Sequence, residues 1–135
     1  KSMSKEFLNP KELFDSKQHG FSQIAVSDGG KHVFISGQVA WDENSNIVGE
    51  NDLRIQTQKS IDNLNIALDA VGGSLKDVVM LRIYKVKMSD EDTPIISQVL
   101  IDNFGTENPP PSSWLSVDRL GNKDFMIEIE AQAIV

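Results

Sequence analysis

The feature that most constrains the fold is an alternation of apolar and polar residues over residues 125–135, at the end of the sequence. Successive side chains of a β-strand point to opposite faces of the sheet. One face then carries Phe125, Ile127, Ile129, Ala131 and Ala133. The other face carries Met126, Glu128, Glu130, Gln132 and Ile134. The apolar row needs helices to cover it, whereas the carboxylate row needs water, a partner or a ligand.

The rest of the sequence supplies the strands and helices that such a sheet needs. Apolar and β-branched residues predict strands at residues 22–27, 32–40, 78–88 and 113–117. Apolar residues at helical spacing, each run preceded by capping residues, predict helices at residues 53–71 and 89–104. The segment Asp28-Gly29-Gly30-Lys31 predicts a tight hairpin between the first two strands. Together these elements predict an α+β two-layer sandwich, with one mixed sheet and two helices on one face.

The face without helices carries a mixture of polar and aromatic residues. Ser36, Gln38 and Glu128 lie there together with Phe34 and Trp114. A wholly solvated face is usually more charged and less aromatic, so the mixture predicts self-association, with polar pockets where the copies meet. The alternative is a solvent-facing sheet with incidental aromatic residues.

Composition bounds the class of protein. With 135 residues the sequence predicts one domain, at residues 20–135, preceded by an extension at residues 1–19. It contains no cysteine, which excludes disulfides and thiolate chemistry. The net charge of −7 disfavours nucleic acid as a partner. No apolar run approaches the roughly 20 residues of a membrane span, and no signal peptide is evident, so a cytoplasmic protein is expected.

Neither a metal ion nor another cofactor is expected. His19 and His32 lack the spacing of metal ligands. The acidic cluster at residues 90–92 lacks the glycine and the distal glutamate of a calcium loop, and helix capping accounts for it. Neither Ser112 nor Ser113 has a histidine base in a nucleophile motif, which argues against serine-hydrolase chemistry.

Five motifs then occur in order along the sequence. They are Phe34–Gln38, Gln58 with Asn63-Leu64 and Ala67-Leu68, Gly72–Val78, Pro109-Pro110, and Ile127–Ala133. In this combination residues 20–135 resemble the Rid family, also called the YjgF or endoribonuclease L-PSP family. The resemblance implies a chorismate-mutase-like fold and a homotrimer. It also implies three small-molecule clefts, each lying between two subunits.

The best-understood branch of that family, RidA, hydrolyses enamine and imine intermediates to 2-keto acids and ammonia. By resemblance, Glu128 is the catalytic acid that positions or activates the attacking water, and Ser36-Gly37 lines the cleft. RidA proteins bind the substrate carboxylate with an arginine in the proline turn, where this sequence has Ser112. A short, neutral serine cannot grip a carboxylate with two parallel hydrogen bonds. The sequence therefore resembles the branches that lack this arginine, and whether Arg82 or Arg119 reaches the cleft instead is open.

The other candidate residues have two interpretations each. Phe21 stands where a tyrosine is common near the family's cleft, and it forms a cleft wall with Trp114 or packs in an interface. Ser112 and Ser113 bind a small polar ligand or stabilise the turn. Glu130 lies two residues from Glu128 on the same face, where its charge would raise the pKa of Glu128 toward neutrality. Both acids could instead be structural.

Three hypotheses of function follow. The first is a trimeric hydrolase of imine- or enamine-type metabolites. The second is a non-catalytic trimer whose clefts bind a small metabolite, which the missing arginine favours. The third is the endoribonuclease or translation-inhibitor role in the family label. The charge of −7 and the absence of paired catalytic histidines argue against the third.

Overall fold

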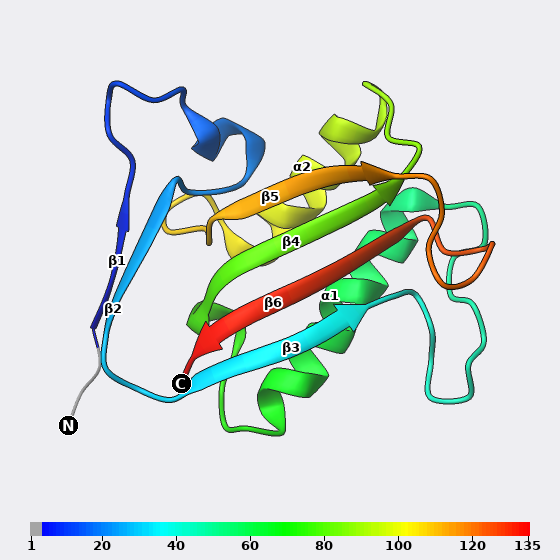
Figure 1. The fold of residues 1–135 in the computed structure, drawn as a ribbon, viewed down its shortest axis with the longest axis horizontal. Coiled ribbons are helices and arrows are strands. Elements are labelled where there is room, and N and C mark those ends of the chain that lie inside the picture. The colour runs from blue at the N-terminus through cyan, green and yellow to red at the C-terminus, as the bar shows by residue number, and fades with distance from the viewer. Residues whose placement is uncertain (1–3) are drawn as a thin grey trace.

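The computed structural model describes residues 4–135, and it contains a four-stranded mixed sheet with two helices behind it (Figure 1). The helices are α1 (Leu53–Asp69) and α2 (Asp92–Phe104). In spatial order the strands are β3 (His32–Gln38), β6 (Ile127–Ile134), β4 (Val78–Val86) and β5 (Ser112–Val117). Strand β5 is parallel to β4, and the other two pairs are antiparallel. The predicted α+β fold, with a mixed sheet and two helices, is confirmed.

The hydrophobic core lies between the sheet and the helices. All five apolar residues of the C-terminal row are buried, as the alternation predicts. They meet residues at helical spacing, Ile61, Leu64 and Leu68 of α1 and Ile96, Val99 and Leu100 of α2, and all six are buried. Burying a side chain of this size stabilises a fold by about 1.5–3 kcal/mol, so this row of contacts fixes which face of β6 the helices cover.

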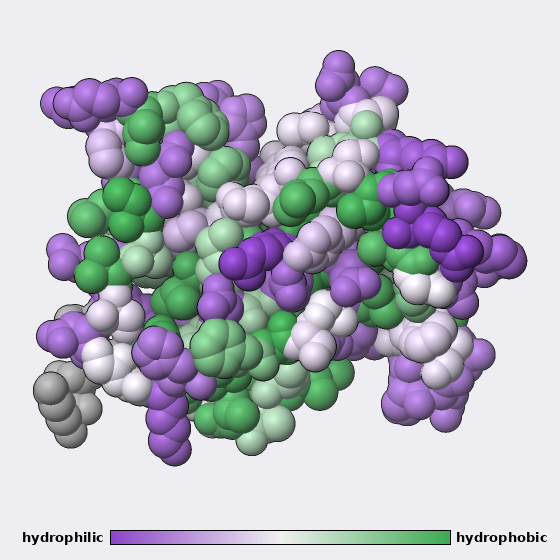
Figure 2. All heavy atoms as spheres, in the orientation of Figure 1, coloured by the Kyte–Doolittle hydropathy of each residue, from purple (hydrophilic) through white to green (hydrophobic). Residues whose placement is uncertain are grey.

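The opposite face of the sheet is turned toward the viewer in Figures 1 and 2, and no helix covers it. Polar and apolar side chains are mixed there (Figure 2). The predicted placement of Gln38 and Trp114 on this face is wrong, because they pair with Ile129 and Ile83, whose side chains are buried on the helix side. Phe34 is 71% exposed on this side, and Glu128 and Glu130 are partly buried. The carboxylate row of β6 therefore lies on the uncovered face, where a ligand or a partner has access to it.

The predicted hairpin between the first two strands is wrong. Strand β2 (Ile24–Asp28) pairs with β1 (Ser4–Leu8), which lies in the expected extension and was not predicted as a strand. Strand β3 pairs with β6 instead. Gly29 and Gly30 have φ angles of 99° and 92°, a conformation open mainly to glycine, and they form a corner rather than a closed hairpin. The two-stranded β1–β2 ribbon consequently runs across the ends of the main strands (Figure 1).

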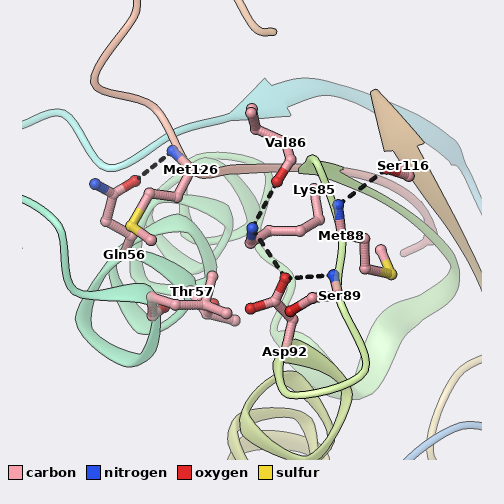
Figure 3. Close-up of polar contacts among 10 residues, drawn as sticks. Gln56, Thr57, Lys85, Val86, Met88, Ser89, Asp92, Ser116 and Met126 are labelled. Carbon is pink, nitrogen blue, oxygen red and sulfur yellow. Dashed lines mark hydrogen bonds and ion pairs between the residues drawn. The ribbon is translucent and has the colours of Figure 1, made fainter. Parts of the chain in front are cut away.

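A buried ion pair joins the end of β4 to the start of α2 (Figure 3). Lys85 Nζ lies 3.0 Å from Asp92 Oδ2, and only 8% of the lysine side chain is exposed. The ammonium also donates to the carbonyl of Val86, and the backbone N–H of Ser89 donates to Asp92 Oδ2. Although burial alone would raise it, these donors hold the pKa of Asp92 below its usual value. The charges of the pair are therefore satisfied inside the fold, away from the uncovered face.

Two shorter elements complete the description, the single turns η1 (Ser16–His19) and η2 (Leu75–Asp77). A capping box between Ser74 and Asp77 begins η2. The side chain of Asp52 caps α1 by accepting a hydrogen bond from the Ile55 N–H. Within residues 4–135, no helix has the length and apolar character needed to cross a bilayer.

Candidate active site

Glu128 lies directly against the backbone of Gly37 on the uncovered face. A β-carbon added at residue 37 would lie 2.5 Å from Glu128 Cδ and 2.7 Å from Cγ, so only glycine leaves room for the carboxylate. The pairing of β3 with β6 shifts register between Ile35 and Gln38, which is a bulge at this point. The glycine within the strand therefore allows the close approach of the Glu128 side chain to the backbone.

Burial and a neighbouring charge tune this carboxyl group. Removal from water raises the pKa of Glu128 above its usual value, and the negative charge of Glu130 raises it further. The Tyr84 hydroxyl donates a hydrogen bond to Glu130, and that bond, together with burial, raises the pKa of Tyr84. A carboxyl group with a raised pKa is better matched to moving protons near neutral pH. Glu128 is thus a carboxyl group that holds its proton more readily than a free glutamate side chain.

Arg82 lies in the same row of side chains. It faces Glu130 across β6 and Ser113 across β5, so all three point to the uncovered face. Its Nη1 lies 4.0 Å from Glu130 Oε1, and 44% of its side chain is exposed. Arg119, in contrast, donates to the carbonyls of Leu120 and Gly121 in the turn after β5. Of the two arginines that the sequence left open, Arg82 is the one on the face of Glu128.

Three of the candidate residues form a separate group at the edge strand β5. Ser112 and Trp114 face Leu81 and Ile83 in β4, so they point to the helix side of the sheet. The Trp114 indole N–H donates to Ser112 Oγ at 2.8 Å. The ring of Phe21 packs against Trp114 with 6.2 Å between centroids. Within one chain this group of Phe21, Ser112 and Trp114 is therefore on a different surface from Glu128.

The sequence-based candidates thus divide into two groups. Ser36, Gly37, Ser113 and Glu128 belong to the uncovered face, and Phe21, Ser112 and Trp114 belong to the β5 edge. Sequence reasoning missed Tyr84, which faces Glu128 across β4 and β6. The alternation of Arg82 and Tyr84 with buried Leu81 and Ile83 indicates that Tyr84 points to the uncovered face. Only the register between β4 and β6 shows that it lies opposite Glu128. Among the residues that the structure describes, no three His, Asp or Glu side chains converge as metal ligands.

A four-stranded mixed sheet with two helices on one face and a carboxylate on the other defines an α+β protein with an exposed sheet-face site. The profile of the family described as Endoribonuclease L-PSP matches residues 15–135. The chain therefore belongs to this family, which is also called the Rid or YjgF family.

Two relatives illustrate the sequence similarity. A "RutC family protein" of Pyrococcus horikoshii is 35% identical over 104 residues, covering 77% of this chain and 79% of the relative. The "3-aminoacrylate deaminase RutC" of Acinetobacter baylyi is 33% identical over 103 residues, covering 76% and 79%.

Two solved structures illustrate the similarity of the fold. The Rid-family protein YyfB of Yersinia pestis, described as of unknown function, superposes with a TM-score of 0.91 at 35% identity, covering 97% of this chain and 98% of its own. TdcF of E. coli with bound serine superposes with a TM-score of 0.69 at 29% identity, covering 80% and 84%.

Proposed function

We propose that this protein hydrolyses small imine- or enamine-type metabolites with release of ammonia, using a water molecule activated by Glu128. The observation that carries the proposal is the Glu128 carboxylate, held against Gly37 with a raised pKa on the uncovered sheet face. The deaminase name of the Acinetobacter relative, and the serine bound to TdcF, support a small-molecule substrate. An enamine first takes a proton at carbon and becomes an imine, so one site handles both.

The chemistry needs one base that later acts as an acid. The water oxygen bonds to the imine carbon, its proton passes to the Glu128 carboxylate, and the π electrons of C=N move to nitrogen. Nitrogen then takes the proton from Glu128, which gives a carbinolamine. The C–N bond breaks as nitrogen takes another proton and leaves as ammonia, while the hydroxyl loses its proton and becomes a carbonyl. A carboxyl group whose pKa is raised serves both directions of proton transfer.

We further propose a homotrimer in which the two groups of candidate residues meet between subunits. Glu128, Gly37 and Ser36 of one copy would form one wall of the cleft. Phe21 and Trp114 at the β5 edge of the next copy would form the apolar wall opposite. The separation of the two groups within one chain supports this arrangement, because neither group alone encloses a ligand. The proposal keeps residues 20–135 as the domain, with residues 1–19 as its extension.

We place the chain among the family members that lack the carboxylate-binding arginine. Ser112, at the position of that arginine, is neutral and already accepts a hydrogen bond from Trp114. A hydrogen bond to a charged group contributes about 1.5–3 kcal/mol, so substrates held through a carboxylate would bind more weakly unless another cation binds them. The position of Arg82 on the same sheet face as Glu128 supports that role.

The direct test measures ammonia and carbonyl product from imines generated in the assay by a second enzyme, with 2-aminoacrylate and 3-aminoacrylate as first substrates. The comparison is between the wild type, Glu128→Gln and the control Glu50→Gln, which changes an exposed acid in another loop. We expect release above the buffer rate in the wild type and the control, and none in Glu128→Gln. Equal rates in all three variants would exclude Glu128 as the base.

The second candidate is a trimer that binds a metabolite without converting it, which the neutral Ser112 favours. Thermal-shift measurements with keto acids and with neutral metabolites distinguish the two. A ligand that raises Tm and is never consumed would support binding alone. The family label suggests RNA cleavage, but the net charge of −7 opposes it. RNA cleavage that disappears in Glu128→Ala would restore the endoribonuclease hypothesis.

A further inference from the structure

Strand β3 has an open edge. Lys31 and Val135 exchange both of their backbone hydrogen bonds, at 2.7 and 2.9 Å, so they form a hydrogen-bonded pair at the start of the β3–β6 ladder. Such pairs alternate along an antiparallel ladder, so the N–H and C=O groups of His32 and Phe34 point away from β6. Within residues 4–135 no other strand pairs with β3. Exposed strand edges of this kind accept another strand.

A groove lies beside the same edge, where β3 ends. It has a volume of about 740 Å³, and its lining includes Gly37, Gln38 and Val39 from the strand with Asn63, Ile66 and Ala67 from α1. Ile66 is 66% exposed there. A helix flanking an unpaired edge covers one face of an added strand, so the open edge has the shape of a docking site for one more strand.

Strand β2 has the second open edge. It pairs with β1 on one side, and no other strand within the described part of the chain pairs with it on the other. A two-stranded ribbon is marginally stable by itself. Its outer face carries Leu8, Ile24 and Val26, which are 42%, 37% and 44% exposed. In Figure 2 apolar spheres follow this ribbon at the left of the molecule.

The two open edges are complementary. Pairing β2 with β3 in the antiparallel register of the sequence puts Ile24 opposite Ile35 and Val26 opposite Val33. All four side chains then point to the helix side of the sheet, where Val33 and Ile35 already pack against the core. A shift by one residue would turn the apolar side chains of β2 to the other face, so hydrophobic matching selects this register or one displaced by two.

Within one copy, both ends of β2 are fixed away from the edge of β3. Before the strand, Ser22 forms a bridge with Pro111, and Phe21 packs on Trp114. After the strand, Gly29 and Gly30 form the corner. On β1, Lys5 Nζ lies 3.2 Å from Asp77 Oδ1 at the end of η2. The ribbon is thus held across the strand ends, where it cannot reach β3 of its own sheet.

We propose that β2 of one copy pairs with the open edge of β3 in a second copy, so that each ribbon extends the sheet of its neighbour. The occupant of the edge is therefore this chain itself. Such a contact is head-to-tail, because the two surfaces differ, and it closes into a ring when the rotation between copies permits. The inference rests on the trimer of the proposed function and adds to it the backbone contact that joins its subunits.

The absence of cysteine from the sequence permits a clean cross-linking test. Val26→Cys and Val33→Cys are made as two separate single variants and co-expressed, so that any disulfide between positions 26 and 33 must join two chains. A second pair, Val26→Cys with Ile35→Cys, covers the register displaced by two. We expect a covalent dimer of the two single variants on a non-reducing gel, and a ladder up to the closed ring when both cysteines are in one chain.

The opposite result is equally specific. The protein could form a trimer in which the double-cysteine chain has only internal disulfides and the co-expressed single variants form none. That result would overturn the pairing of β2 with β3 of a second copy. It would leave the trimer and the proposed reaction intact. If light scattering gave the wild type the mass of one chain, both the pairing of β2 with β3 between copies and the trimer would be overturned.

A second pair of variants tests the backbone contact in any register. Phe34→Pro removes an N–H that points away from β6, whereas Phe34→Ala removes the side chain and keeps that donor. We expect the proline variant alone to lose assembly in light scattering, with the circular dichroism of the folded chain retained in both. Assembly kept by both variants, or lost by both, would contradict pairing through this edge.

Discussion

The close approach of Glu128 to Gly37 gives a sharp prediction for Gly37→Ala. Gly37 does not have a left-handed backbone conformation, so alanine fits the local chain. Its methyl group would lie 2.7 Å from Glu128 Cγ. Carbon atoms pack at about 3.5–4.0 Å, so the glutamate must move by about 1 Å or more. The substitution therefore displaces the carboxylate without removing it.

Gly37→Ala should lower the reaction rate far more than it changes the free energy of unfolding. A misplacement of about 1 Å costs on the order of 100-fold in rate, or about 2.7 kcal/mol of transition-state stabilisation. The clash involves the end of a flexible, partly exposed side chain, and alanine is itself better suited than glycine to a strand interior by about 0.5–1 kcal/mol. We therefore expect kcat/KM to fall by about 100-fold while the free energy of unfolding changes by less than about 1 kcal/mol.

The assay compares Gly37→Ala with the matched control Gly121→Ala, because a β-carbon at residue 121 meets no atom within 4 Å. Ammonia release gives the rate, and urea titration gives the free energy of unfolding. The control should match the wild type in both. Full activity in Gly37→Ala would refute the placement of Glu128 as the reacting group, and a large loss of stability would show that the strand itself depends on the glycine.

Four further predictions concern charge. Glu130→Gln removes the negative neighbour that helps burial to raise the pKa of Glu128, so the acidic limb of the pH–rate profile should move to lower pH. Glu128→Gln should be more stable than the wild type at neutral pH, because the wild type loses stability as pH rises through a folded pKa of Glu128 that lies above the ordinary 4.5. Urea titrations at several pH values measure this difference in stability, which should disappear below pH 4.5. Asp92→Asn leaves the Lys85 ammonium buried without its partner, and should lower the free energy of unfolding by about 3–5 kcal/mol, whereas the exposed-site control Asp90→Asn should not. Because the pKa of Asp92 is depressed, the wild type should lose the stability of this ion pair only as pH falls below about 3.8.

The residues that were predicted well are those whose neighbours are close in sequence. The alternation from Phe125 to Ala133 identified the buried row because a strand has a period of two. The capping residue Asp52 was recognisable because a helix cap involves residues three apart. These local rules sufficed for the fold class and for the position of Glu128 on the uncovered face.

The misplaced or missed features depend on pairing between distant segments. Tyr84 was not a candidate because its place opposite Glu128 follows from the register of β4 against β6. The failed hairpin has a similar cause. Two glycines permit a tight hairpin and an open corner equally, and contacts such as that of Phe21 with Trp114 favour the corner. Which groups converge in the site is likewise a property of the assembled sheet.

The most direct test of the central claim is a crystal structure of the assembled protein with a 2-keto acid product bound. We predict the product in a cleft between two subunits, with the Glu128 carboxylate of one subunit about 2.6–3.2 Å from its keto oxygen or from one bridging water. Phe21 and Trp114 of the adjacent subunit should close the opposite side. A product bound elsewhere, or a Glu128 carboxylate out of reach of every bound ligand and water, would contradict the account.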